Sequence, residues 1–167
     1  AQFGPTVAPY YPLREEMIKI AGYAQRIAAQ PLVCDLHAGN GFIGSLLARE
    51  GVEVIGLRDP QVKPNQIKNF YDRGHYTLKE MAIEDIDFPF DVAFSNWMPS
   101  GQNLTPAIVK HHPKLIVYIH SLHLNEASGQ YQTGTLEAFE HLPVNYKLVD
   151  EWMVTRPADV LLEIWPD

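Results

Sequence analysis

An apolar run that leads directly into a glycine-rich turn most constrains the fold of this chain. Residues 32–36 read LVCDL, which is typical of a buried strand. The turn that follows has the spacing Gly-x-Gly-x-x-Gly, carried by Gly39, Gly41 and Gly44. An apolar helical pattern starts at Phe42, so the turn opens a helix. Because such a turn lets the backbone approach a ligand at a helix N-terminus, we expect a ligand site here.

Strand-like and helix-like patterns alternate along most of the chain. The expected strands are 32–36, 52–57, 75–78, 90–95 and 115–119, and the expected helices are 13–29, 42–47, 65–72 and 105–110. Alternation across short connections favours parallel strands covered by helices on both faces. The sequence therefore predicts an α/β fold with a Rossmann-like, doubly wound, mostly parallel sheet.

The C-terminal part of the chain departs from this alternation. Residues 146–154 and 159–165 are strand-like, and the link between them is too short for a crossover helix. They predict an antiparallel hairpin added to the sheet. We expect residues 1–167 to form one domain, with residues 1–12 as a candidate N-terminal lid or arm.

Composition and charge narrow the classes of partner. Hydrophobic residues make up 46% and charged residues 20% of the chain, as in ordinary globular proteins. A formal net charge of -7 disfavours an extended phosphate-binding surface. Without an apolar stretch of membrane-spanning length or a signal-peptide pattern, we expect a cytoplasmic protein with no membrane partner. Cys34 is the only cysteine and should be a buried thiol.

The sequence DLHAGNG, from Asp35 to Gly41, resembles the first motif of the class I S-adenosylmethionine (SAM) methyltransferases. His37 stands where glycine is commoner in the family. A branch that includes several RNA and DNA methyltransferases has an aromatic residue there, followed by Ala-Gly-x-Gly, and His37 fits that variant. The resemblance implies SAM as the cofactor, with backbone around Gly39, Asn40 and Gly41 close to its methionine portion. Asp35 would help to organise the SAM amino group and the turn.

The family's second site is an acidic residue at the end of the second strand, where it binds the ribose hydroxyls. Here Arg58 occupies that position and Asp59 follows it. Because side chains alternate along a strand, Asp59 reaches the ribose only if the strand has already ended.

The family's third site lies near the adenine and is usually Asp followed by a small residue. Met81 and Ala82 occupy the matching positions. Met81 can cover the adenine face but cannot accept its amino proton, and Glu80 or Glu84 would have to do so.

The expected reaction site is the end of the fourth strand, because ligands of parallel sheets bind at the carboxyl ends of strands. Asn96 and Pro99 partly match the family's Asn-Pro-Pro-aromatic pattern, found where amino groups are methylated, whereas Trp97 and Met98 do not match it. Asn96 can hold an amine, and Trp97 can pack a flat substrate or the sulfonium. The simpler alternative is that Asn96 caps a turn and Trp97 belongs to the core.

Histidines follow the fifth strand on the other side of the same expected crevice. His120 is a candidate general base, because imidazole titrates near neutral pH. His120 and His123 also have a metal-like spacing, but they have no clear third ligand, so we expect no metal.

Three functional interpretations remain open on the sequence. The first is a SAM-dependent methyltransferase, with a small-molecule acceptor slightly favoured and protein or nucleic-acid acceptors still open. The second is a degenerate, non-enzymatic binding or scaffold protein, because Arg58 and Met81 replace two cofactor-binding acids. The third is an NADP-dependent reductase, in which Arg58 would meet the 2'-phosphate, although no Tyr-x-x-x-Lys pair is present. The sequence gives no indication of the oligomeric state.

Overall fold

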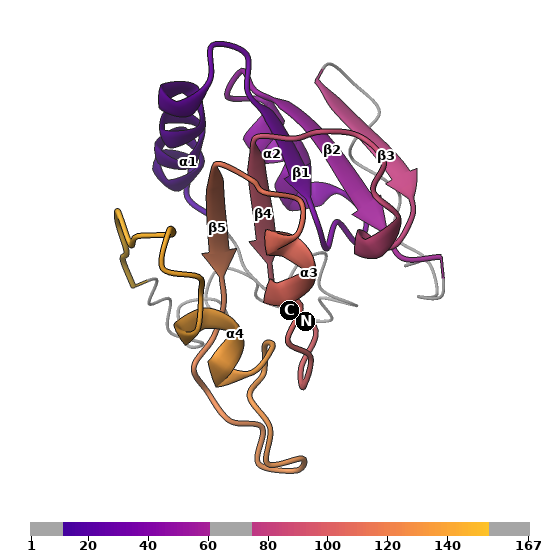
Figure 1. The fold of residues 1–167 in the computed structure, drawn as a ribbon, viewed down its shortest axis with the longest axis vertical. Coiled ribbons are helices and arrows are strands. Elements are labelled where there is room, and N and C mark those ends of the chain that lie inside the picture. Colours follow the sequence, from indigo (N-terminus) through magenta and orange to yellow (C-terminus); the bar gives the residue numbers. More distant parts are fainter. Residues whose placement is uncertain (1–11, 61–74, 154–167) are drawn as a thin grey trace, which may run out of the picture.

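A five-stranded, wholly parallel sheet forms the centre of the protein in a computed structural model, which describes residues 12–60 and 75–153 (Figure 1). Its strand order is β3-β2-β1-β4-β5, so the chain runs outward from β1 and then returns to β4. The strands are β1 (Leu32–Asp35), β2 (Glu53–Arg58), β3 (Tyr76–Glu80), β4 (Val92–Asn96) and β5 (Leu115–Ile119). The helices are α1 (Arg14–Ile27), α2 (Phe42–Ala48), α3 (Thr105–Val109) and α4 (Leu136–Glu140), with a 3-10 turn η1 (Ile83–Asp85).

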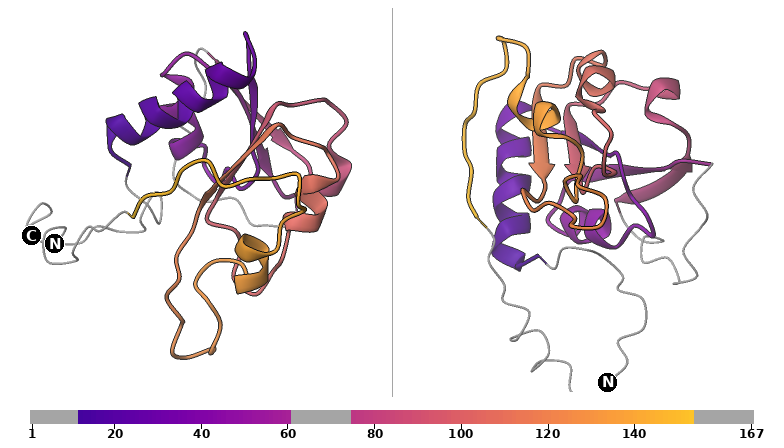
Figure 2. Two further views of the ribbon diagram at one scale, coloured as in Figure 1. Left: turned by 60° about the vertical axis from the view of Figure 1, so that its left-hand side comes forward. Right: turned by 90° about the horizontal axis from the view of Figure 1, so that it is seen from below.

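The central strands β1 and β4 are buried on both faces, which explains their continuous apolar sequences. Val33 and Phe94 face one side of the sheet and belong to a core with α1 and α2. Cys34 and Ala93 face the other side and belong to a core with η1, α3 and α4. Figure 2 shows helices on both sides of the sheet. The predicted parallel α/β architecture and the buried thiol of Cys34 are therefore confirmed.

Helix α1 shows how the local sequence sets an element's bounds and its buried face. The carboxylate of Glu16 accepts a hydrogen bond from the backbone N–H of Leu13 at 2.7 Å, which closes the first turn. Met17, Ile20 and Ala24 recur at helical spacing and are buried against the sheet.

Residues 146–153 form no strand in the structure, and two of their side chains contact α1. Asp150 accepts a hydrogen bond from the hydroxyl of Tyr23 at 2.6 Å and pairs with Lys19 at 3.1 Å. The indole N–H of Trp152 donates to Glu16 at 3.3 Å, and Lys19 lies over the same indole. The second run of the predicted hairpin lies outside the described residues, as do the predicted helix at 65–72 and residues 1–11 of the candidate lid, so the hairpin stays a prediction.

A substitution at Gly56 tests how tightly the sheet packs around Tyr76, and one at Gly22 in α1 provides the contrast. A Cβ at Gly56 would overlap the hydroxyl end of Tyr76, whereas a Cβ at Gly22 in α1 would meet nothing within 4 Å. Gly56→Ala should lower the free energy of unfolding by about 1–3 kcal/mol through overpacking. Gly22→Ala should raise it by about 0.5–1 kcal/mol, because alanine is the better helix former. Urea unfolding measures both, and wild-type stability in Gly56→Ala would contradict this packing.

Candidate functional site

The glycine-rich turn is fixed between the ends of two strands. The backbone N–H of Ala38 donates to the carbonyl of Leu57 at 3.1 Å, which ties the turn to β2. The N–H of Leu36 donates to the carbonyl of Phe94 at 2.9 Å, which ties it to β4. Gly39 and Gly41 have φ values of 58° and 84°, a region that favours glycine. The turn therefore lies where the strand order reverses, the usual place for a ligand in such sheets.

Asp35 lies beneath this turn, inside the core. The residue is 2% exposed, and its carboxyl group accepts a hydrogen bond from the hydroxyl of Tyr76 at 3.2 Å. Side chains at Gly44 or Gly56 would overlap this pair, so both glycines make room for it. Burial raises the pKa of Asp35 to about 7, although the Tyr76 hydrogen bond acts in the opposite direction. Asp35 thus supports the turn from within the core.

His37 lies partly buried in the turn and contacts the neighbouring strand. Its Nε2 is 2.9 Å from the hydroxyl oxygen of Ser95 in β4. Burial lowers the pKa of His37 to about 4, so the ring is neutral at neutral pH. A neutral ring bonded to Ser95 adds a second connection between the turn and β4.

Three buried side-chain atoms have no hydrogen-bond partner among the described residues. They are Nδ2 of Asn40, Oδ1 of Asn96 and Nδ1 of His120. Asn40 lies in the turn between β1 and α2, Asn96 is the last residue of β4, and His120 directly follows β5. A buried polar group without a partner costs about 1–3 kcal/mol, so such groups usually mark a place where a ligand or water binds. All three were predicted site residues.

The two candidate catalytic residues, Asn96 and His120, lie at the ends of the neighbouring strands β4 and β5, but on different faces of the sheet. Asn96 pairs with Ile119 across β4 and β5, and Ile119 packs against the core on the α1 side. His120 comes one residue later, and its ring stacks on Phe139 of α4 on the opposite side. A ligand between them would have to lie across the end of the sheet rather than on one face.

Trp97 has an unusual backbone conformation directly after β4. Its φ is 69°, which is rare for a bulky residue, while its N–H still donates to the carbonyl of Ile119 at 2.9 Å. Strained residues of this kind concentrate at functional sites. The indole is partly buried and packs against the core on the α1 side of the sheet. The alternative in which Trp97 belongs to the core therefore accounts for part of its contacts.

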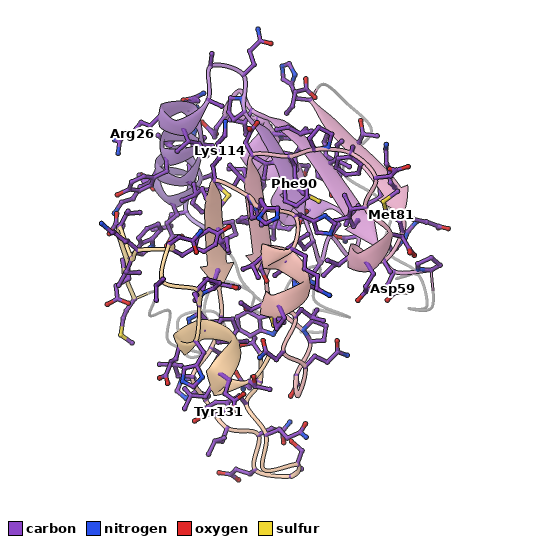
Figure 3. All side chains as sticks on the ribbon, viewed as in Figure 1. Arg26, Asp59, Met81, Phe90, Lys114 and Tyr131 are labelled. Atoms are coloured by element: carbon purple, nitrogen blue, oxygen red, sulfur yellow. The ribbon has the colours of Figure 1, made fainter. Side chains whose placement is uncertain are left out.

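Asp59, the candidate ribose-binding residue after β2, is exposed. Strand β2 ends at Arg58, so Asp59 follows the strand end, the condition for it to reach a ribose. Arg58 forms an ion pair with Glu80 at 3.4 Å, which partly neutralises its charge. Met81 lies beside it, because its N–H donates to the carbonyl of Arg58 at 3.1 Å. Figure 3 shows Asp59 and Met81 at the same end of the sheet. Ala82 comes next, at the start of η1.

No three His, Cys, Asp or Glu side chains come together as a metal site within residues 12–60 and 75–153. Over the same residues, no helix combines the length and apolar character needed to cross a membrane.

No family model matches the chain. Among the curated proteins, none has a significant sequence match to it. The site therefore has to be interpreted from its own residues.

Sequence reasoning missed the residues that support the site. Tyr76 begins β3 opposite Val54, and only the tertiary structure shows that its hydroxyl passes over Gly56 to reach Asp35. Ser95 and Phe139 touch His37 and His120 through tertiary contacts. Helix α4, which carries Phe139, was not predicted; its signal was Thr135, whose hydroxyl accepts a hydrogen bond from the N–H of Ala138.

The pH dependence of stability tests the burial of Asp35. Between about pH 4 and 7 the folded state keeps a proton that the unfolded state has lost, so this group makes the free energy of unfolding fall as pH rises. Asp35→Asn cannot ionise, so it should gain stability relative to the wild type across that window and level off above about pH 7.

Urea unfolding of both proteins at several pH values measures this difference. His37, with its lowered pKa, destabilises the folded state as pH falls over the same window, so only the difference between the two proteins isolates Asp35. A difference that does not change with pH would contradict the buried, protonated carboxyl.

Proposed function

We propose that this protein is a SAM-dependent methyltransferase and that its acceptor is a small molecule carrying an amino group. The observation that carries the proposal is a set of three buried polar atoms without a hydrogen-bond partner among the described residues: Nδ2 of Asn40 in the turn, Oδ1 of Asn96 at the end of β4 and Nδ1 of His120 after β5. They combine a hydrogen-bond donor, an acceptor and an imidazole nitrogen. This is the mixture that a polar ligand with an amino-acid end and a nucleophilic acceptor would complete.

The turn suits the methionine portion of SAM. Oδ1 of Asn40 accepts from the N–H of Phe42 at 3.1 Å, which leaves Nδ2 of Asn40 as a donor for the SAM carboxylate. The backbone at Gly39 is exposed, and a Cβ there would meet nothing within 4 Å, so a ligand has room to approach. When bound, SAM would supply a methyl group activated on a sulfonium. In this proposal Asp35 and His37 hold the turn, and Gly41 is the N-cap of α2.

The nucleoside portion would extend toward β2 and β3. Asp59 follows the end of β2 and would accept hydrogen bonds from the ribose hydroxyls. Met81 and Ala82 lie next to it at the start of η1 and would cover the adenine. The pairing of Arg58 with Glu80 supports this arrangement over a 2'-phosphate site, because the guanidinium charge is already partly balanced.

The acceptor would bind beyond the end of β4. Oδ1 of Asn96 would accept a hydrogen bond from the acceptor's amino group and orient its lone pair. Trp97 would pack against the acceptor and exclude water. His120 would take up the proton that the nitrogen loses, since burial lowers the pKa of His120 and keeps its ring neutral near pH 7.

Calorimetric titration with SAM, S-adenosylhomocysteine and NADPH tests the cofactor. We expect saturable binding of SAM and S-adenosylhomocysteine that is lost in Gly39→Arg, because the new side chain fills the space at the turn. Gly129→Arg is the matched control: Gly129 is also exposed, has a φ of 72°, and would place its Cβ in open space, but it lies in the connection between β5 and α4. No binding of SAM or S-adenosylhomocysteine would favour the scaffold interpretation. Binding of NADPH alone would favour the reductase.

Asn40 gives a second, finer prediction for the same site. Asn40→Ala should weaken S-adenosylhomocysteine binding roughly 10-fold to 100-fold, the range expected for losing a hydrogen bond to a charged group. Asn103→Ala is the matched control. Asn103 makes the same local bond, to the N–H of Thr105 at 3.2 Å at the start of α3, but its side chain is exposed. Equal affinity in the two variants would remove Asn40 from the binding site.

A further inference from the structure

The imidazole of His120 is stacked on an aromatic ring that no sequence pattern connected to it. The ring centroids of His120 and Phe139 are 3.9 Å apart, and their planes differ by 13°. The ring of Tyr118 meets Phe139 edge-on at 5.1 Å. Phe139 therefore lies between one residue of β5 and the residue that directly follows β5.

The backbone around α4 fixes Phe139 relative to the end of β4. The N–H of Gly134 donates to the carbonyl of Met98 at 2.9 Å, and the N–H of Gly101 donates to the carbonyl of Gly134 at 2.9 Å. A Cβ at Gly134 would lie 3.0 Å from both Met98 and Phe139, so the segment is closely packed. Figure 1 shows α4 beyond the end of β5. Helix α4 thus presents Phe139 at the same edge of the sheet as Asn96.

The stack explains how the ring of His120 is held while one of its nitrogens stays without a partner. Nδ1 is buried and has no hydrogen bond within the described residues. Contact with Phe139 fixes the plane of the imidazole without occupying either nitrogen, because the contact is made through the faces of the two rings.

We propose that Phe139 is a positioning residue, which holds the imidazole of His120 so that Nδ1 receives the proton that the methyl acceptor loses. This rests on the proposed methyltransferase function. The lone pair of the acceptor nitrogen forms the new N–CH3 bond, and the electron pair of the broken S–CH3 bond stays on sulfur. The nitrogen's surplus proton passes to Nδ1 of His120 and then to solvent, so atoms and charges balance.

Few charged groups lie around the imidazole among the described residues. Burial is the largest influence and lowers the pKa of His120, while the Ser121 backbone and the charge of Glu151 act to raise it. Tyr118 shares this face, and its own pKa is raised by burial. The titratable residues of α4 and its C-terminal end are exposed: Glu137, Glu140 and His141. The ring is therefore neutral and able to accept a proton near pH 7.

Histidine ring signals, followed by NMR as a function of pH on isotope-labelled full-length protein, test this role. In the wild type, Nδ1 of His120 should have the nitrogen shift of an unprotonated ring atom near pH 7, and the titration midpoint should lie below 6.5. In Phe139→Leu the ring loses its stack and gains solvent, so the midpoint should rise by up to about one pH unit. Phe139→Tyr should restore the wild-type midpoint.

Phe88→Leu is the matched control, because Phe88 is also half-buried against the same core but contacts Phe90 and Lys79. It should leave the midpoint of His120 unchanged. An unchanged midpoint in Phe139→Leu, or a protonated Nδ1 in the neutral wild-type ring, would overturn the proposal.

Titration of the same samples with S-adenosylhomocysteine separates this inference from the proposed function. Binding of equal strength in the wild type and Phe139→Leu, with a shifted midpoint, supports positioning without a general loss of structure. Failure of the wild type to bind would sink the methyltransferase proposal, whereas the midpoints report on the His120–Phe139 pair by themselves.

Discussion

The buried carboxyl group of Asp35 lies where four elements of the fold meet. It is placed by β1, hydrogen-bonded by Tyr76 of β3, and given space by Gly44 of α2 and Gly56 of β2. A carboxyl group in the core is costly unless it is bonded or protonated, and this one is both bonded and shifted toward the protonated form. The turn directly above it therefore rests on a close-packed base.

The polar side chains at the carboxyl ends of the strands have the opposite character, because several of them lack hydrogen-bond partners. Nδ2 of Asn40 in the turn, Oδ1 of Asn96 at the end of β4 and Nδ1 of His120 after β5 are enclosed by protein but have no partner among the described residues. The turn that carries Asn40 is held tightly by backbone bonds to β2 and β4. A rigid support under unsatisfied polar groups is a preorganised arrangement, in which a ligand would gain hydrogen bonds without reorganising the site.

Local sequence patterns gave the strands and the longest helix, because burial in a parallel sheet requires continuous apolar runs and helical packing requires a regular spacing. The same kind of pattern predicts a strand over 146–154 as part of a hairpin that stays a prediction; within residues 146–153, Asp150 and Trp152 contact α1. Alternating apolar residues fit a strand and an extended segment equally well, and only long-range partners distinguish them. Helix α4 was missed because its five residues are too few to show a periodic pattern.

The sequence by itself determined the parallel α/β architecture and the glycine turn after β1, because these follow from local patterns. It also indicated Asn96 and His120 as site candidates from where parallel strands end, and Asn40 from the resemblance of the turn to a family motif. Only the tertiary structure decided that Asp35 faces inward to Tyr76, that Asn96 and His120 lie on different faces, and that Phe139 stacks on His120. These facts depend on contacts between segments far apart in the chain, and side-chain direction at such contacts is set by packing rather than by the neighbouring residues.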